Sequence, residues 1–301
     1  MVPHQWISKD RVAETTISGK ARRDPNQQMF EPKTLTTPSQ SFWSMIDVMY
    51  HTIVRKIRQG HRNAVVGIAL DVLRSIVMVL AFFVIFLVLG LRSSPIRGDF
   101  LLFIMTGIFV YMTHIRAVTA VAGAEGPTAA MMKHAPMNTL IAIVSAAFSA
   151  LYTQILALGT ILLVYHIVFT PITIDQPIGA MGMLLVAWFS GIAVGTVFLA
   201  VIPWIPDLGQ LLRTFYVRVN MIASGKMFVV NTLPASMVAL FDWNPLFHII
   251  DQIRGFVFLH YNPFVTSIMY PIYFSLAVLM IGMLGEFFTR RSVSLSWTAG
   301  R

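Results

Sequence analysis

The chain contains no cysteine and few charged residues. None of its 301 residues is cysteine, so the sequence excludes a disulfide framework and a thiolate metal site. Only 12% of the residues are charged whereas 56% are hydrophobic, and this balance is too apolar for a soluble domain of such length. These shortages exclude a soluble domain and predict a polytopic membrane protein.

Acidic side chains are fewer than basic ones. The chain has 22 Lys and Arg against 13 Asp and Glu, and residues 1–62 alone hold ten Lys and Arg against five acids. A basic segment ahead of the apolar runs is typical of a cytosolic flank that faces anionic lipid. We therefore expect membrane lipids, and no nucleic acid, as partners of this charge.

The N-terminal region has no apolar run near Met1 that could serve as a cleaved signal peptide. Residues 1–40 are rich in Pro, Thr, Gln and charge without any period, which predicts a flexible cytosolic tail. In residues 41–62, apolar side chains recur at every third or fourth position and basic side chains cluster at the far end. This pattern predicts an amphipathic interface helix on the inner membrane surface.

Six apolar runs follow, each comparable with the roughly 20 residues that a helix needs to cross a bilayer. They cover about residues 68–91, 100–119, 139–169, 179–202, 211–232 and 264–288. The runs predict an all-α fold with six transmembrane helices in a permease domain of residues 63–291. Residues 292–301 then form a cytosolic C-terminal tail.

Residues 234–263, between the last two runs, are apolar but carry Asp242, Asp251 and Arg254. Such a segment can dip into a bilayer only where protein or water surrounds it. We therefore predict a re-entrant helical insert between the fifth and sixth spans. Two crossings with a polar insert between them suit the lining of a pore better than an enzyme pocket.

The distribution of Lys and Arg predicts the orientation of the chain. With the N-terminus inside, the inner flanks collect seventeen of these residues and the outer loops three, with Arg74 and Lys226 left in the spans. Since Lys and Arg accumulate on the cytosolic side, both termini are expected in the cytosol.

Lys226 is unusual because a lysine in a span costs about 2.5–3.5 kcal/mol at the bilayer centre. It follows Ser224 and Gly225, where a helix break is expected. The lysine then either points into an outer vestibule or extends to the outer headgroups. On the fourth span, Gly191 and Gly195 would let another helix of the same subunit approach closely.

The candidate chemical motifs are weak. The sequence Ser224-Gly225-Lys226-Met227 fails as a phosphate-binding loop, because Asn220 stands where the first glycine is needed and Met227 where Ser or Thr is needed. If ATP is used, another chain binds it. No histidine spacing fits a metal site, so no metal is expected.

His248 and Asp251 lie three residues apart on an expected helix. Such a pair could act as acid and base, or it could be a structural polar contact within the insert. The aromatic side chains of the insert are either an interfacial belt or a surface along which a ligand slides.

The order of these features resembles the permease subunit of type-2 ABC exporters, in the branch that exports capsular polysaccharide and O-antigen chains. The likeness covers about residues 41–291 and rests on an amphipathic helix, an inner loop after the second span and a series of motifs. These motifs are Asp207-Leu208-Gly209-Gln210-Leu211-Leu212, Ser224-Gly225 with Phe228, Leu233-Pro234, Trp243-Asn244-Pro245-Leu246-Phe247-His248 with Asp251 and Arg254, and Ser267 with Tyr270. The family often has an aliphatic residue at the position of Lys226 and Glu at that of Asp251.

The resemblance implies an exporter of two such permeases, a homodimer, with two ATP-binding cassette ATPase subunits that bind ATP and magnesium, so that this chain binds no cofactor itself. A periplasmic co-polymerase or export partner is a further expectation. The inner loop and the amphipathic helix would contact the ATPases through Glu125, Gly126, Pro127, Met131, Lys133, Arg55 and Arg58. From the residues alone, that inner loop is either a docking stub or an ordinary connection.

The insert would form paired helices that shape the outer mouth of the channel. The residues expected at the substrate channel and outer mouth are Ser224, Gly225, Lys226, Trp243, Asn244, Pro245, Phe247, His248, Asp251, Arg254, Phe258 and Tyr261. The function expected is ATP-driven export of a lipid-linked or otherwise amphiphilic polysaccharide across the bacterial inner membrane, with no enzyme activity in this chain. The alternatives are an exporter of a small hydrophobic drug or lipid, and an intramembrane transferase that uses His248 and Asp251.

Overall fold

The computed structural model describes residues 38–59, 64–88, 90, 96–124 and 139–298. Residues 1–44 and 45–301 form two separate units, and the second holds the transmembrane helices and the site. All regular structure in the described residues is helical, which confirms the predicted all-α class. Of the predicted tail of residues 1–40, residues 1–37 lie outside the described residues, as do residues 125–138, and residues 38–40 begin α1.

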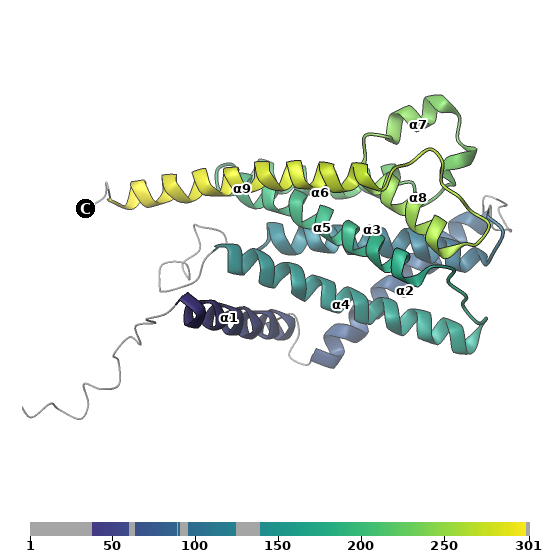
Figure 1. The fold of residues 1–301 in the computed structure, drawn as a ribbon, viewed down its shortest axis with the longest axis horizontal. Coiled ribbons are helices and arrows are strands. Elements are labelled where there is room, and N and C mark those ends of the chain that lie inside the picture. The colour runs from purple at the N-terminus through teal and green to yellow at the C-terminus, as the bar shows by residue number, and fades with distance from the viewer. Residues whose placement is uncertain (1–37, 60–63, 89, 91–95, 125–138, 299–301) are drawn as a thin grey trace, which may run out of the picture. The chain divides into compact units, whose positions relative to one another are not determined.

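The helices are joined by connections of varied length (Figure 1). They are α1 (Pro38–Gln59), α2 (Ala64–Val88), α3 (Phe100–Ala122), α4 (Thr139–Val168), α5 (Pro177–Val201), α6 (Pro206–Ala223), α7 (Ala235–Phe241), α8 (Pro245–Val257) and α9 (Met269–Thr298). A single 3₁₀ turn, Val230–Thr232, precedes α7. The helix predicted over residues 41–62 corresponds to α1, which begins three residues earlier.

Five helices are long and apolar enough to cross a membrane. They are α2 from Val66, α3, α4, α5 and α9 as far as Ser292. Because a span needs roughly 20 apolar residues, these helices support a membrane protein and correspond to five of the six predicted crossings.

The predicted fifth crossing, residues 211–232, does not form one apolar helix. Helix α6 begins five residues earlier, at Pro206, and ends at Ala223, and it is not among the five apolar helices. Polar side chains along one face of α6 lower its hydropathy, and the turn at Ser224 and Gly225 ends it. The prediction of six equivalent spans is therefore not confirmed.

Helix α3 lies at the centre of the bundle. Within a membrane-length window, 78% of its residues are buried, against 22% for α2 and for α9. Its neighbours are α2, α4, α5 and α8, and α5 in turn packs along α9. Figure 1 shows α3, α4, α5 and α9 running alongside one another, with α7 and α8 near one end of this group.

Glycines on α5 allow it to approach α3 closely. A Cβ at Gly191 would lie 2.5 Å from the carbonyl oxygen of His114, and a Cβ at Gly195 would lie 2.8 Å from the Cβ of Val121. Real Cβ atoms do not make such contacts, so only glycine fits at these two positions. The predicted role of Gly191 and Gly195 in packing within one subunit is confirmed.

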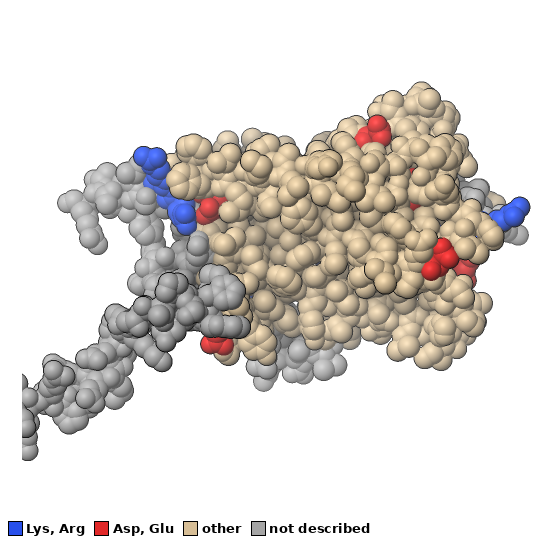
Figure 2. Space-filling model, viewed as in Figure 1, with Lys and Arg blue, Asp and Glu red and all other residues tan. Residues whose placement is uncertain are grey.

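Charged side chains are confined to the two ends of the molecular face shown in Figure 2, and the middle of that face is free of Lys, Arg, Asp and Glu. At the end where α2 begins, the Asp71 carboxylate lies 3.6 Å from Arg74 and 3.1 Å from Arg116. A neutral band between charged ends is what the hydrocarbon core of a bilayer requires.

Candidate functional site: the α6–α8 region and a pocket beside Asp99

The chain breaks after α6, at the position expected from the sequence. Ser224 ends the helix, and Gly225 has φ = 76°, in the left-handed region that glycine adopts without strain. A Cβ at Gly225 would also lie 2.9 Å from the ring of Phe247. The turn therefore brings the residues after α6 directly against α8.

Arg254 of α8 holds this turn. Its side chain is fully buried and its guanidinium donates to three carbonyl oxygens, those of Gly225 (3.3 Å), Lys226 (2.7 Å) and Phe228 (2.7 Å). The guanidinium carbon also lies 4.0 Å from the centroid of the Phe103 ring in α3. A planar fork with several donors is the side chain that can satisfy three converging acceptors.

Arg254 and Asp251, one helical turn apart on α8, bind different partners. No salt bridge to Arg254 occurs among the described residues; the Asp251 carboxylate instead accepts hydrogen bonds from the hydroxyls of Tyr261 and Thr266 (2.8 Å to Thr266). The side-chain amide of Gln252 donates to the backbone oxygen of Thr266 at 2.8 Å. One face of α8 thus binds the turn before it, and another binds the chain after it.

Both ring nitrogens of His248 also form hydrogen bonds within the fold. The backbone N–H of Ser267 donates to Nδ1 (3.1 Å), so Nε2 carries the proton and donates to the backbone oxygen of Asp242 (2.7 Å). The Asp242 carboxylate lies 3.2 Å from the same nitrogen. His248 and Asp251 therefore bond to different partners, and the acid–base pair weighed from the sequence is not formed. The structural interpretation of these two residues is the one that agrees with the geometry.

The start of α8 is tied to the end of α6. The side-chain oxygen of Asn244 caps α8 by accepting from the N–H of Leu246 (3.0 Å), and Pro245 occupies the first helical position. The side-chain amide nitrogen of Asn244 donates to the side chain of Asn220 (2.9 Å) and to the carbonyl of Ala223 (3.0 Å). The Asn-Pro motif therefore both begins a helix and fixes its position.

Lys226 was expected either to point into an outer vestibule or to extend to the outer headgroups, but its side chain is buried within the chain. It is 2% exposed, and its Nζ lies 3.5 Å from the ring centroid of Tyr111 and 4.9 Å from that of Phe82. No side chain or backbone group of the described residues forms a hydrogen bond with this nitrogen. Its main stabilising contact is with the ring faces, which attract a cation most when water is excluded.

Most of the residues expected at the channel are inside this chain. Trp243 is 56% exposed, but the other eleven are buried. These buried residues are Ser224, Gly225, Lys226, Asn244, Pro245, Phe247, His248, Asp251, Arg254, Phe258 and Tyr261. They form the interior of the insert and its anchors. That they line a conduit stays a prediction.

Helix α6 carries a polar stripe that the sequence interpretation missed. Asp207, Gln210, Thr214 and Arg218 recur at intervals of three and four, so they share one face, and all four are exposed. The opposite face packs through Gly209, Tyr216, Asn220 and Ala223. The 3.6-residue period was the available signal, but it was obscured because the predicted run began at Leu211 and included the turn.

Tyr216 joins this packed face to the core. Its hydroxyl lies 2.8 Å from Nε2 of His114 in α3, and Nδ1 of the same ring lies 2.8 Å from the hydroxyl of Ser190 in α5. His114 is completely buried, so both of its nitrogens are satisfied by neighbouring helices.

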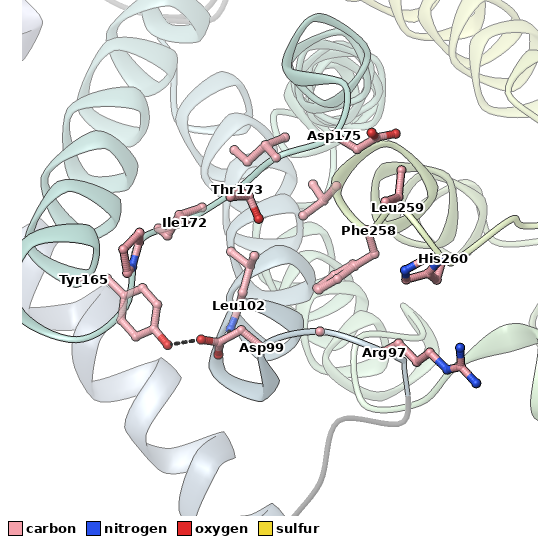
Figure 3. A pocket seen from close by; sticks show the side chains of 14 residues that line it. Arg97, Asp99, Leu102, Tyr165, Ile172, Thr173, Asp175, Phe258, Leu259 and His260 are labelled. Carbon is pink, nitrogen blue, oxygen red and sulfur yellow. Dashed lines mark hydrogen bonds between the residues drawn. The ribbon is translucent and has the colours of Figure 1, made fainter.

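A pocket of about 470 Å³ opens where three connections meet (Figure 3). These are the residues before α3, the α4–α5 connection and the residues after α8. Backbone N–H groups of Asp175 and Gln176 donate to the carbonyls of Val257 (3.3 Å) and Phe256 (2.8 Å), which joins two of the walls. The lining includes Arg97, Asp99, Leu102, Tyr165, Ile172, Thr173, Asp175, Phe258, Leu259 and His260.

Asp99 organises one side of this pocket. One carboxylate oxygen caps α3 by accepting from the N–H groups of Leu101 and Leu102, and the other accepts from the hydroxyls of Tyr165 and Thr170. Burial opposes ionisation, but these four donors together hold the pKa of Asp99 below its ordinary value. Asp99 could have been identified from the sequence as a helix cap, because it directly precedes an apolar run.

The ATPase-coupling prediction falls largely outside the described residues, which do not include Glu125, Gly126, Pro127, Met131 and Lys133. Arg55 and Arg58 lie on α1, and the side chain of Arg58 is not described. In the part of the chain that the structure describes, no group of three or more His, Cys, Asp or Glu is placed to hold a metal.

No protein-family model matches the chain, and no curated protein is significantly similar to it in sequence.

Proposed function

We propose that this chain is the membrane-spanning permease subunit of an ATP-driven exporter of capsular or O-antigen type polysaccharide, carried as a lipid-linked or otherwise amphiphilic chain. The observation on which the proposal rests is the polar stripe of α6. Asp207, Gln210, Thr214 and Arg218 are exposed on the face opposite to the one that packs on α3 and α5.

The stripe is costly in any lipid-facing position. At about 1.5 Å per residue, α6 is about 27 Å long, nearly the thickness of the hydrocarbon core, and Arg218 lies about 18 Å from its first residue. A charged side chain at depth costs about 2.5–3.5 kcal/mol, and Gln210 adds an unpaired amide. A water-filled conduit, shared with a second copy of the chain, removes these costs.

The insert supplies a fixed wall beside this conduit. Helix α8 is fastened at its start by Asn244, along its length by Arg254 and on its far side by Asp251, so it is a rigid unit and not a free loop. Phe247 and Ile250 are fully buried. A non-helical turn and a short helix at membrane depth are tolerated when packed in this way, which supports a re-entrant insert.

The pocket beside Asp99 has a lining that suits sugar. Thr173, Asp175 and His260 offer both donors and acceptors on its rim, and Leu102 with Ile172 gives apolar surface beside them. A sugar ring has hydroxyls around its edge and C–H groups on its faces, so it matches such a mixed lining. A small hydrophobic drug would leave these polar groups unpaired, at a cost of about 1–3 kcal/mol each when buried.

The partners proposed are a second copy of this chain, two ATPase subunits that carry ATP and magnesium, and an export partner on the outer side. The localisation proposed is a bacterial inner membrane with both termini in the cytosol, from the excess of Lys and Arg on one side. The transferase alternative is disfavoured because His248 and Asp251 are each bonded to other groups.

The conduit can be tested by cysteine labelling, since the chain has no cysteine of its own. Gln210→Cys and Thr214→Cys should react quickly with a water-soluble methanethiosulfonate reagent in membranes. Ile281→Cys is the control, because Ile281 is 62% exposed on the apolar surface of α9 and should stay unreactive in lipid. Equal reaction rates at Gln210 and Ile281 would contradict a water-filled conduit along α6.

The substrate is tested by deletion of the gene and by purification. Deletion should cause a polysaccharide to accumulate in the cytosol, and the wild-type chain should restore its export and co-purify with an ATP-hydrolysing subunit. Loss of drug or lipid efflux, with no glycan retained, would favour the alternative exporter. Turnover by the purified subunit alone, abolished by His248→Ala without loss of assembly, would favour the transferase.

A further inference from the structure

A second cavity lies at the other end of α3 from the pocket beside Asp99. Its volume is about 480 Å³, and it opens between α2, α3 and α4, with one residue from α1. Its lining comprises Lys56, Asp71, Arg74, Arg116, Thr119, Ala120, Ala146, Ser149, Ala150 and Thr153.

The lining is basic on one side and small on the other. Among the lining residues, Lys56, Arg74 and Arg116 are basic and Asp71 is the one acid. Asp71 orients the two arginines, at 3.1 Å from Arg116 and 3.6 Å from Arg74. The opposite wall consists of Ala, Ser and Thr side chains, which leave room for a group the size of a phosphate.

The depth of the cavity matches a lipid headgroup layer. Arg116 lies seventeen residues after Asp99, so at about 1.5 Å per residue the two are about 26 Å apart along α3. The hydrocarbon core of a bilayer is about 30 Å thick. With the pocket beside Asp99 at one headgroup layer, the basic cavity therefore lies at the other.

A separate apolar groove lies along the same three helices and adjoins the basic cavity on α2, where Val72 of its lining follows Asp71. It has a volume of about 310 Å³ and is lined by Val72, Ile76, Val79, Leu80, Leu101, Met105, Thr160, Ile161, Val164, Tyr165 and Phe169. On α4, Thr160 of the groove follows Thr153 of the basic cavity by seven positions, about 10 Å along the helix, and on α3 the groove is lined by Leu101 and Met105, which lie nearer Asp99 than Arg116. A charged end and an apolar continuation together have the form of a lipid.

We infer that the groove between α2, α3 and α4 binds one anionic phospholipid, with its phosphate in the basic cavity and an acyl chain in the apolar groove. Arg and Lys between transmembrane helices at headgroup level attract anionic headgroups, and a guanidinium donates to phosphate oxygens in pairs. Exposed Leu70 and Val77 share the helix face of Arg74, so acyl chains would also contact α2 beside the cavity. This inference does not depend on the exporter proposal.

The ligand is tested by lipid titration of the purified full-length chain in mild detergent. The probes are dioleoyl-phosphatidylglycerol, dioleoyl-phosphatidylcholine and inorganic phosphate, and the readouts are lipid retention in native mass spectrometry and the melting temperature. We expect one phosphatidylglycerol to be retained per chain and to raise the melting temperature, with no effect of the other two probes. Equal retention of phosphatidylcholine, or an equal effect of inorganic phosphate alone, would overturn the inference.

The position is tested with charge and shape variants. Lys56→Gln combined with Arg74→Gln should weaken phosphatidylglycerol binding roughly 30-fold, at about fivefold for each charge removed. Ile76→Trp should also reduce retention, because it fills the apolar groove without a change of charge. Arg97→Gln removes the same charge at the opposite end of α3 and should bind lipid as the wild type does.

The contrary outcomes are equally specific. A loss of binding in Arg97→Gln as large as that for one charge in the basic cavity would show that net charge alone attracts the lipid. Unchanged retention in Ile76→Trp would place the acyl chain elsewhere. Melting temperatures measured in phosphatidylcholine separate loss of binding from loss of folding, since Arg74 is 70% exposed and Ile76 is partly exposed.

Discussion

Replacement of Arg254 by alanine is the sharpest test of how the insert is held. The side chain is fully buried, donates to three carbonyl oxygens around the turn after α6 and covers the ring of Phe103. Arg254→Ala would leave these acceptors without donors and a space between α8 and α3. The turn and α8 would then lose their main connection.

The cost follows from opposing contributions. Hydrogen bonds that involve a charged group contribute about 1.5–3 kcal/mol each, and a desolvated cation over a ring contributes about 2 kcal/mol more. Burial of the guanidinium away from water costs several kcal/mol, and this cost is absent in the variant. For removal of one partner from such a buried arrangement we expect a net loss of about 3–5 kcal/mol.

The assay is thermal unfolding of the purified chain, followed by tryptophan fluorescence. At about 2 °C per kcal/mol for a domain of this size, Arg254→Ala should lower the melting temperature by roughly 6–10 °C. Arg254→Lys should fall between, because an ammonium keeps the charge but has no planar fork. Arg97→Ala is the matched control; Arg97 is exposed, and its loss should cost less than about 0.5 kcal/mol.

The reasoning would be refuted by a melting temperature for Arg254→Ala within about 2 °C of that for Arg97→Ala, a difference of about 1 kcal/mol. In that case the carbonyls would find water or other donors, and the insert would not depend on Arg254. Export measured on the same variants would then have no reason to differ.

Three further substitutions test other contacts by thermal unfolding. Gly191→Ala should lower the free energy of unfolding by about 1–3 kcal/mol, since the new Cβ would lie 2.5 Å from a carbonyl oxygen of α3. Gly182→Ala on the same helix is the control, because its Cβ meets nothing within 4 Å, and it should be neutral or slightly stabilising. Equal melting temperatures for the two variants would contradict this packing. Tyr216→Phe should cost about 1–3 kcal/mol because the buried Nε2 of His114 loses its hydroxyl partner, and an unchanged melting temperature would show that the contact is dispensable. Asp99→Ala should cost about 0.5–2 kcal/mol through loss of the helix cap. Because the pKa of Asp99 is lowered on folding, the stability that its carboxylate contributes is complete above pH about 4 and is lost as the pH falls through the folded pKa. The difference in melting temperature between wild type and Asp99→Ala should therefore shrink in acid. A constant difference down to pH about 2 would contradict this reasoning.

The helices of the bundle could be predicted from the sequence because their signals are local. Apolar runs of sufficient length identified α2, α3, α4, α5 and α9, and the pair Ser224 and Gly225 identified the helix break. Two glycines four residues apart on α5 identified a close helix contact. In each case, the property that decides the structure is contained in a few neighbouring residues.

The partners of Arg254 and Lys226 could not be predicted in the same way. Asp251 lies one helical turn from Arg254, but the guanidinium donates instead to three backbone carbonyls of the turn after α6. Backbone oxygens have no signature in a sequence. The ring faces that enclose Lys226 belong to Tyr111 and Phe82, more than a hundred residues away, so only the folded chain brings them together.

Both cavities were missed for a related reason. The pocket beside Asp99 is built from three connections that precede α3, follow α4 and follow α8, and the basic cavity is built from four helices. Each helix or connection contributes between one and five residues, too few to form a motif. What the sequence did contain was the charge itself, since Arg74 and Asp71 were recognisable as neighbours on one helix.

A single face of α3 explains why the α6 stripe and the insert belong to one unit. Phe103 lies under Arg254, Gly107 makes room for the Cβ of Lys226 and Tyr111 lies under its ammonium, and His114 bonds to Tyr216. The intervals of four, four and three place these residues of α3 in one row, so α8, the turn and α6 are all fastened along the same line. The packed face of α6 is thereby fixed at Tyr216, and the polar stripe lies, beside exposed Leu211 and Phe215, on the side that remains for the proposed conduit or a second copy of the chain.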